Sequence, residues 1–173
     1  MPDAAKFSAM ESLRSGRAVE IRALRPSDRQ AMQAAVDRAS SQSLYRRFFG
    51  VKREFSEKEA SFFLNVDFVN HVALVAVVKE GDRDIIVGGG RYVVARPGTA
   101  ELAFTVVDEH QGQGIGTLLM RHLLALARQA KLKELVAEVL AENISMLKVF
   151  QKNGFAMDSK REPGIVHVAL ALG

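Results

Sequence analysis

Three glycines between Gln111 and Thr117 are spaced two residues apart, at positions 112, 114 and 116. They follow a strand-like segment, residues 99–107, and precede a long run of apolar residues at helical spacing, residues 115–130. The unpaired N–H groups of a first helical turn point outward and carry partial positive charge, which favours an anion. Glycine lets the chain turn sharply and lets the anion approach the backbone without meeting a Cβ atom. The stretch therefore predicts a site for a phosphate-bearing cofactor.

The spacing of the glycines separates this turn from other phosphate-binding loops. A dinucleotide-binding fingerprint needs G-x-G-x-x-G, but Thr117 stands where the third glycine would be. A Walker A loop needs a lysine after its last glycine, and none follows here. The pattern Gln111-x-x-Gly114-x-Gly116 instead resembles the Q/R-x-x-G-x-G/A signature of the GCN5-related N-acetyltransferases (GNAT). That resemblance implies that the pyrophosphate of acetyl-CoA is held by Gln111, Gly112, Gln113, Gly114, Ile115, Gly116 and Thr117.

The elements around this turn follow from the apolar patterns. Strands are expected at residues 17–24, 71–78, 85–94, 99–107, 134–140, 155–159 and 165–172, and helices at about 28–39, 44–49, 57–65, 115–130 and 143–153. This order predicts an α/β (α+β) fold with a single GNAT-like domain, whose mixed central sheet has about seven strands and helices on both faces. Residues 1–16 are polar and are expected to form a flexible lead-in to a domain covering residues 17–173.

Composition narrows the classes of partner. No apolar run approaches the ~18 residues needed to span a bilayer, and the N-terminal residues lack the apolar core of a signal peptide, so a cytoplasmic protein without a membrane partner is expected. The net charge of +4 is mild and comes without a basic tract interleaved with aromatic residues, so nucleic acid is not an expected partner. The histidines have no partners at metal-ligand spacing, and no metal is expected.

The absence of cysteine bears on the mechanism. It excludes disulfides, thiolate metal ligands and a cysteine acyl-enzyme, and it favours direct attack of an amine on the thioester within a ternary complex. A free lysine has a pKa near 10.4, so its neutral form costs about 4.6 kcal/mol to reach at pH 7. The site is therefore expected to contain a general base.

Glu101 is the first candidate for that base, because it lies in a strand-like segment that leads to the glycine turn. The segment Ala100 to Phe104 resembles the A-E-[IL]-x-F strand of lysine acetyltransferases, and the resemblance implies that this glutamate is the general base. The alternative is a solvated glutamate at a strand start. Glu138 and Glu142 are weaker candidates, and Asp108 and Glu109 are expected at the surface because acids there would repel phosphates.

The resemblance also implies a place for the thioester. A backbone N–H of the strand that Val106 and Val107 end is expected to bind the thioester oxygen, where this strand splays from the strand at residues 134–140. Asn143 is implied as a CoA contact, although a plain helix N-cap explains it equally well. Phe150 stands where the motif N-x(6)-Y-x-K-x-G-F has a tyrosine that serves as general acid. The thiolate therefore leaves without that acid, or another group supplies the proton.

Three further segments bear on the acceptor. They are Ile21-Arg22-x-Leu24-Arg25-Pro26-x-Asp28, Ser43-x-Tyr45-x-Arg47-Phe48-Phe49 and Glu138-Val139-Leu140-Ala141-Glu142-Asn143. They resemble the bacterial Pat-type protein lysine acetyltransferases, which also lack the tyrosine. This implies acetyl-CoA as donor and a protein lysine as acceptor. No sequence feature distinguishes a monomer from a homodimer. Two alternatives stay open: acetylation of a small amine, such as an amino acid or a polyamine, and an acyl-CoA-binding module without turnover.

Overall fold

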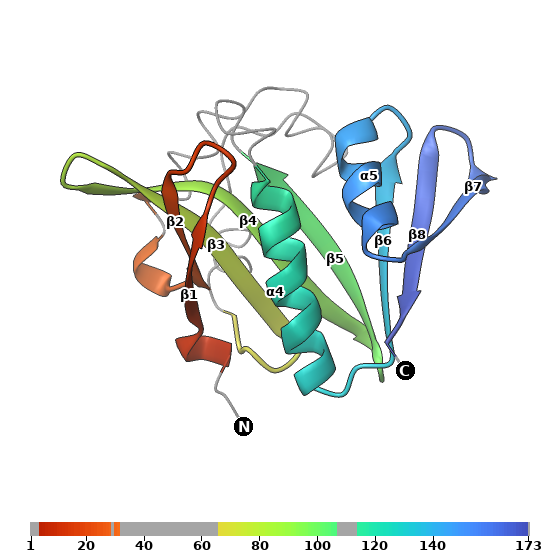
Figure 1. Ribbon diagram of the computed structural model, residues 1–173. Coiled ribbons are helices and arrows are strands. Elements are labelled where there is room, and N and C mark those ends of the chain that lie inside the picture. Colours follow the sequence, from red (N-terminus) through yellow and green to blue (C-terminus); the bar gives the residue numbers. More distant parts are fainter. Residues whose placement is uncertain (1–3, 29, 32–65, 107–113, 173) are drawn as a thin grey trace.

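A single eight-stranded sheet organises the chain (Figure 1). The computed structural model describes residues 4–28, 30–31, 66–106 and 114–172. The spatial order of the strands is β1-β2-β3-β4-β5-β6-β8-β7, and the neighbours are antiparallel except for β5 and β6. Their bounds are β1 Ser8–Ser12, β2 Ala18–Ala23, β3 His71–Glu80, β4 Arg83–Arg96, β5 Thr99–Val106, β6 Glu134–Leu140, β7 Ala156–Glu162 and β8 Ile165–Ala171.

Two α-helices belong to the described part of the chain, α4 (Ile115–Gln129) and α5 (Ile144–Lys152), with short 3₁₀ helices η1 (Ala4–Lys6) and η2 (Pro26–Asp28). The mixed α/β fold expected from the sequence is confirmed, with eight strands where about seven were predicted. Of the helices expected between residues 28 and 65, residues 30 and 31 are helical and the rest lie outside the described residues. No helix in the described ranges is long and apolar enough to cross a membrane.

The sheet carries apolar residues on both faces, and β3 shows this directly. Its first eight residues are all buried. Val72, Leu74 and Ala76 belong to the large core cluster that includes the apolar face of α4, whereas Ala73 and Val75 belong to a second cluster. Successive strand residues point to opposite faces, so the two clusters lie on opposite sides of the sheet. The continuous apolar run in the sequence is thus explained by a strand covered on both sides.

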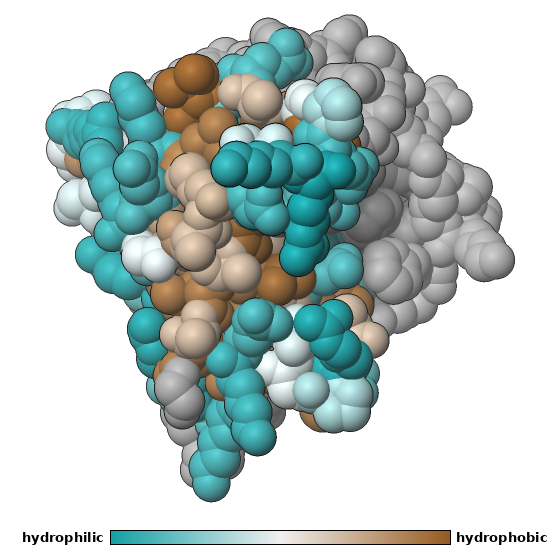
Figure 2. Space-filling view, turned by 90° about the vertical axis from the view of Figure 1, so that its right-hand side faces the viewer, coloured by the Kyte–Doolittle hydropathy of each residue, from teal (hydrophilic) through white to brown (hydrophobic). Residues whose placement is uncertain are grey.

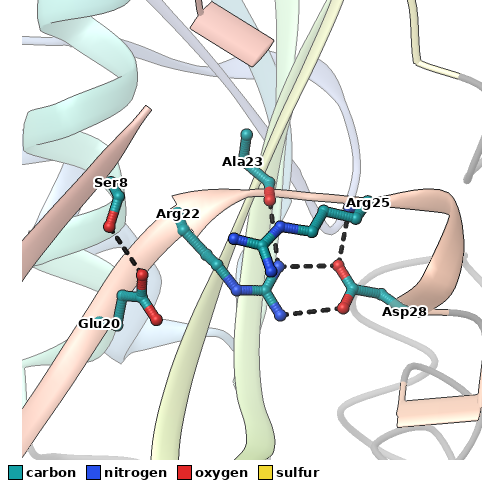
Figure 3. A network of polar contacts seen from close by, with 6 residues as sticks. All are labelled: Ser8, Glu20, Arg22, Ala23, Arg25 and Asp28. Atoms are coloured by element: carbon teal, nitrogen blue, oxygen red, sulfur yellow. Dashed lines mark hydrogen bonds and ion pairs between the residues drawn. The ribbon is translucent and has the colours of Figure 1, made fainter. Parts of the chain in front are cut away.

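The expected flexible lead-in is wrong for residues 8–12, which form β1. This strand pairs with β2 from Ser8–Arg22 to Ser12–Ala18. Ser8 Oγ donates to Glu20 at 2.7 Å (Figure 3). Leu13, just after the strand, is 3% exposed and belongs to the core. The apolar pattern did not reveal β1 because it is an edge strand whose residues alternate between exposed and half-buried. Backbone pairing therefore defines it, with little burial.

A buried ion pair fixes the corner after β2 (Figure 3). Arg22 donates to Asp28 through two nitrogens at 2.8 and 2.9 Å, and the Arg25 N–H donates to the same carboxylate at 2.7 Å. Burial by itself raises the pKa of Asp28, but the Arg22 guanidinium and the Arg25 N–H outweigh it and lower that pKa below its ordinary value. Both side chains are 8% exposed, so this pair is shielded from solvent.

Candidate active site

The parallel strands β5 and β6 separate after a short region of pairing. Their three residue pairs run from Thr99–Glu134 to Glu101–Val136, although β5 continues to Val106 and β6 to Leu140. β6 stays paired with β8 as far as Leu140, so its open edge is the one toward β5. In Figure 1 the two strands lie side by side near their first residues and diverge toward their carboxyl ends. Backbone groups facing such a split need partners, and an extended ligand can supply them.

Glu101 belongs to the last β5–β6 pair before the split. Its neighbour Leu102 is buried in the cluster that includes α4, so Glu101 points to the opposite face of the sheet. Its cross-strand partner on β4 is Val93, and its partner on β6 is Val136. The side chain is exposed. A carboxylate thus stands at the base of the split, on the face away from α4, where a molecule from solvent can reach it.

The first turn of α4 lies at the open end of the split (Figure 1). Gly114 is the N-cap residue of this helix, with φ of 92° and no side chain capping the helix. That φ lies in the left-handed region, which favours glycine. Ile115 is 1% exposed and anchors the turn in the core, whereas Thr117 is exposed. A helix whose N-terminal N–H groups are not capped by a side chain provides donors for an anion.

The described residues leave out four of the predicted cofactor-binding residues, Val107, Gln111, Gly112 and Gln113, together with Asp108, Glu109 and His110. The backbone of Val106 ends β5 on the edge of the split. On the other side of the first turn of α4, Val149 of α5 lies 4.0 Å from where a Cβ on Gly116 would be.

The β1–β2 hairpin adds positive charge that the sequence did not reveal. Its turn lies beside the N-terminus of α4 (Figure 1), and Arg14 Nε is 3.7 Å from where a Cβ on Gly114 would be. Glu11 fastens the hairpin to α4, since it accepts from His122 Nε2 at 3.0 Å and pairs with Arg121 at 2.9 Å. The hydrogen bond from His122 lowers the pKa of Glu11 below its ordinary value, and Arg121 adds to this. No local motif marks Arg14, because strand pairing brings it to this place.

Aromatic packing joins α5 to β5 on the face of the sheet that α4 covers. Phe150 of α5 is 1% exposed, and its ring lies edge-on to Phe104 and Phe155, with centroids 5.9 and 4.9 Å away. Phe104 in turn lies over Gly90 of β4, where a Cβ would come within 2.7 Å of the ring. The residue in the tyrosine position of the motif is therefore a core residue that joins α5 to β5. The triple glycine of β4 also adjoins a register shift in its pairing with β3.

Asn143 is the N-cap of α5, and its Oδ1 accepts the N–H of Met146 at 3.3 Å. The capping role left open by the sequence is thus observed, and the side-chain nitrogen takes no part in it. Glu138 and Glu142 are both exposed. Glu138 is two residues beyond the last β5–β6 pair and on the same face of the sheet as Glu101. Glu142 lies in the turn between β6 and α5.

Comparison with known proteins agrees with this geometry. The model of the acetyltransferase (GNAT) family matches residues 42–155. The chain belongs to this family. It is 33% identical over 155 residues to the acetyltransferase PA5475 from Pseudomonas aeruginosa, covering 89% of this chain and 82% of that protein. It is also 32% identical to the acetyltransferase Pat from Mycolicibacterium smegmatis. The match covers 89% of this chain and 46% of that longer protein.

A solved structure extends the agreement to the whole fold. The GNAT domain of PAT from S. lividans superimposes with a TM-score of 0.85 at 31% identity, covering 95% of this chain and 96% of that domain. The predicted resemblance to the acetyltransferase domain of Pat proteins is thereby confirmed. The protein is a GNAT acetyltransferase, and acetyl-CoA is the acyl donor of this family.

Proposed function

We propose that the protein transfers the acetyl group of acetyl-CoA to the side-chain amine of a protein lysine, by direct attack in a ternary complex. The observation that carries the proposal is the end of β5–β6 pairing at Glu101 and Val136, with an exposed carboxylate at the base of the opening. The pantetheine arm would pair with the open edge of β5. This arm would place the thioester between β5 and β6, within reach of an amine that approaches Glu101.

The cofactor would be held at the end of the split that α4 begins. The N–H groups of the first turn of α4, from Gly114 to Thr117, would donate to the pyrophosphate together with the loop residues Gln111, Gly112 and Gln113. Asn143 would contact CoA from the start of α5. Arg14, which lies beside Gly114, would add its positive charge to that of the helix N-terminus facing the pyrophosphate.

In the reaction, the lysine nitrogen attacks the thioester carbon while Glu101 accepts a proton from the amine, directly or through a water molecule. The oxygen that gains charge is stabilised by a backbone N–H at the end of β5, from Val106 or Val107. The carbon–sulfur bond then breaks and the electron pair leaves on sulfur. Because the buried Phe150 has no hydroxyl, CoA departs as the thiolate unless solvent protonates it.

Substitution of Glu101 by glutamine tests the base. The expected result is a 10²- to 10⁴-fold fall in kcat/KM, the typical contribution of a general base, with an unchanged dissociation constant for CoA in calorimetry. Glu80→Gln is the matched control, because it makes the same change at an exposed position at the end of β3. Equal rates for the Glu101 variant and the control would refute the assignment of the base.

The acceptor is tested separately by mass spectrometry. Purified protein and acetyl-CoA are incubated with a deacetylated protein extract, and in parallel with free amino acids and polyamines. Acetyl-lysine sites in proteins, absent with Glu101→Gln, are the expected result. Acetylation of free amines alone would contradict the protein-lysine acceptor and leave the small-amine alternative. CoA binding without turnover of either kind would identify a binding module.

A further inference from the structure

Three potential metal ligands meet at the β7–β8 edge of the sheet, away from the glycine turn. They are Glu138 of β6, Glu162 of β7 and His167 of β8, and one ligand atom from each lies within 4.8 Å of the other two. His167 Nε2 donates to Glu162 Oε1 at 2.9 Å, and His167 Nδ1 lies 3.9 Å from Glu138 Oε1. The imidazole is 18% exposed, and both carboxylates are 51% exposed.

Strand pairing fixes two of these residues rigidly. Glu138 and His167 are directly opposite one another in the β6–β8 ladder, so their side chains share one face of the sheet. The ladder continues on both sides of this pair, from Glu134–Ala171 to Leu140–Ile165. Residues presented by a continuous ladder hold their spacing better than residues on a loop.

An irregularity in β7 brings in the third residue. Asp158 pairs with His167, and regular antiparallel pairing would then place Lys160 opposite Ile165. The register shifts between Asp158 and Glu162, and Glu162 takes that place instead. The residue opposite Ile165 is a diagonal neighbour of His167, so the shift replaces a cation by a carboxylate beside the imidazole.

We propose that Glu138, Glu162 and His167 bind a divalent first-row transition-metal ion of the Zn²⁺ class. Imidazole nitrogen with two carboxylates suits Zn²⁺ and its neighbours, whereas Mg²⁺ and Ca²⁺ prefer oxygen ligands alone. Viewed from this edge, hydrophilic residues flank a band of apolar ones, and the edge is open to solvent (Figure 2). Water therefore completes the coordination.

The ligand atoms need a modest adjustment to enclose an ion. Zn²⁺ bonds of 2.0–2.2 Å put tetrahedral ligand atoms roughly 3.4 Å apart. The three ligand atoms here lie up to 4.8 Å from one another. The half-exposed carboxylates of Glu138 and Glu162 can rotate about their side-chain torsions to close this distance. Glu162 would then exchange its hydrogen bond to the imidazole for a bond to the ion. The assignment depends on this cluster alone and not on the proposed acceptor.

Isothermal titration with Zn²⁺ tests the site, using untagged full-length protein freed of metal by a chelator. One ion per chain is expected, with weaker binding of Mn²⁺ and none of Mg²⁺ at the same concentrations. Glu162→Gln and His167→Gln should each weaken Zn²⁺ binding at least tenfold, since even loss of an outer-shell partner costs about 10- to 100-fold. Glu80→Gln makes the same charge change as Glu162→Gln outside the cluster and should bind like the wild type.

Two results would overturn the proposal. One is no heat of Zn²⁺ binding by protein whose circular dichroism shows an intact fold. The other is equal affinity for the Glu162 and Glu80 variants, which would mean adventitious binding to surface carboxylates. Anomalous diffraction from Zn²⁺-soaked crystals gives an independent readout if His167→Gln fails to fold. A peak between the three side chains supports the site, and a peak only elsewhere contradicts it.

Discussion

The residue at position 150, a phenylalanine, determines whether a side-chain acid is available to protonate the leaving thiolate. It stands where the GNAT motif has a tyrosine, and its ring is buried between Phe104 and Phe155. The two edge-on contacts add to the burial of the ring in holding α5 to β5. A hydroxyl at the ring's para position would enter this apolar contact. The residue therefore serves packing, and the leaving thiolate has no side-chain acid at this position.

The variant Phe150→Tyr tests whether position 150 serves packing or can hold a general acid. Burying a hydroxyl without a hydrogen-bond partner should lower the free energy of unfolding by about 1–3 kcal/mol, and kcat should not rise. Urea unfolding and steady-state kinetics at pH 7–9 check both. A higher kcat with unchanged stability would show instead that the new hydroxyl reaches the split and protonates the thiolate.

Residue positions within local motifs were predictable, and those assembled from distant strands were not. Glu101 and Gly114 could be named as candidates because each lies in a short sequence pattern whose other residues belong to the same predicted site. The pairing of Glu101 with Val136 at the split is consistent with the predicted place of the thioester. Arg14 and Glu162 carry no such pattern, since the first reaches α4 through a hairpin and the second reaches His167 through a register shift. Pairing register is set by the whole sheet, so a single sequence does not disclose these contacts.

At the scale of elements, the corner between β2 and η2 determines how the chain leaves the sheet. Arg22 pairs with Val75 in the β2–β3 ladder. Paired residues share a face, and the pairs continue through Gly89 to Thr105, so Arg22 lies on the face of the sheet that carries Glu101. Its ion pair with Asp28 also engages the Arg25 N–H and the Ala23 carbonyl (Figure 3). The pair thus orients the chain as it leaves β2 on the face of the sheet that carries Glu101.

Asp28→Asn should therefore destabilise the protein strongly. Removing one partner leaves the other charge buried and unpaired, which costs about 3–5 kcal/mol. Because the folded-state pKa of Asp28 is lowered from 3.8, its contribution is present above that value and is lost as pH falls through the folded pKa. Guanidinium unfolding from pH 7 to pH 2 should show that the wild type has the higher free energy of unfolding at neutral pH. Its advantage over Asp28→Asn should shrink below about pH 4. A constant difference between the two proteins over the whole range would contradict this role.

The elements with strong apolar periodicity were predicted within a few residues, as for α4 and β6. β1 was missed, because an edge strand with half-buried residues lacks the alternating apolar signal. The extent of the β5–β6 split was implied by the family resemblance and not by the residues themselves. Parallel pairing of two apolar strands leaves no mark in the sequence at the point where it stops.

At the scale of the molecule, the split between β5 and β6 can be reached from two directions, which the sheet keeps apart. The apolar face of α4 packs on one side of the sheet, and its N-terminus lies at the open end of the split, where the proposed site would hold the pyrophosphate. Glu101 points to the other side. A thioester lying in the split between β5 and β6 would thus be reached by the cofactor from one direction and by the amine from the other. This division is consistent with direct transfer in a ternary complex.

Binding of CoA should stabilise the whole fold against unfolding. Saturation at 100 times the dissociation constant should raise the free energy of unfolding by about 2.7 kcal/mol in the wild type. Gly114→Ala should lose at least half of that rise at the same CoA concentration, because a Cβ at the start of α4 obstructs the approach of phosphate to the backbone.

Gly164→Ala is the matched control for this variant. Gly164 has φ of 79° and Gly114 has φ of 92°, so alanine at either position bears a similar left-handed strain of about 1–2 kcal/mol. Gly164 lies in the β7–β8 turn with nothing within 4 Å of an added Cβ. Both variants should therefore lose similar stability without CoA, and the Gly164 variant alone should keep the full rise with it. Equal rises in the two variants, measured by thermal unfolding across a CoA titration, would show that the phosphates bind elsewhere.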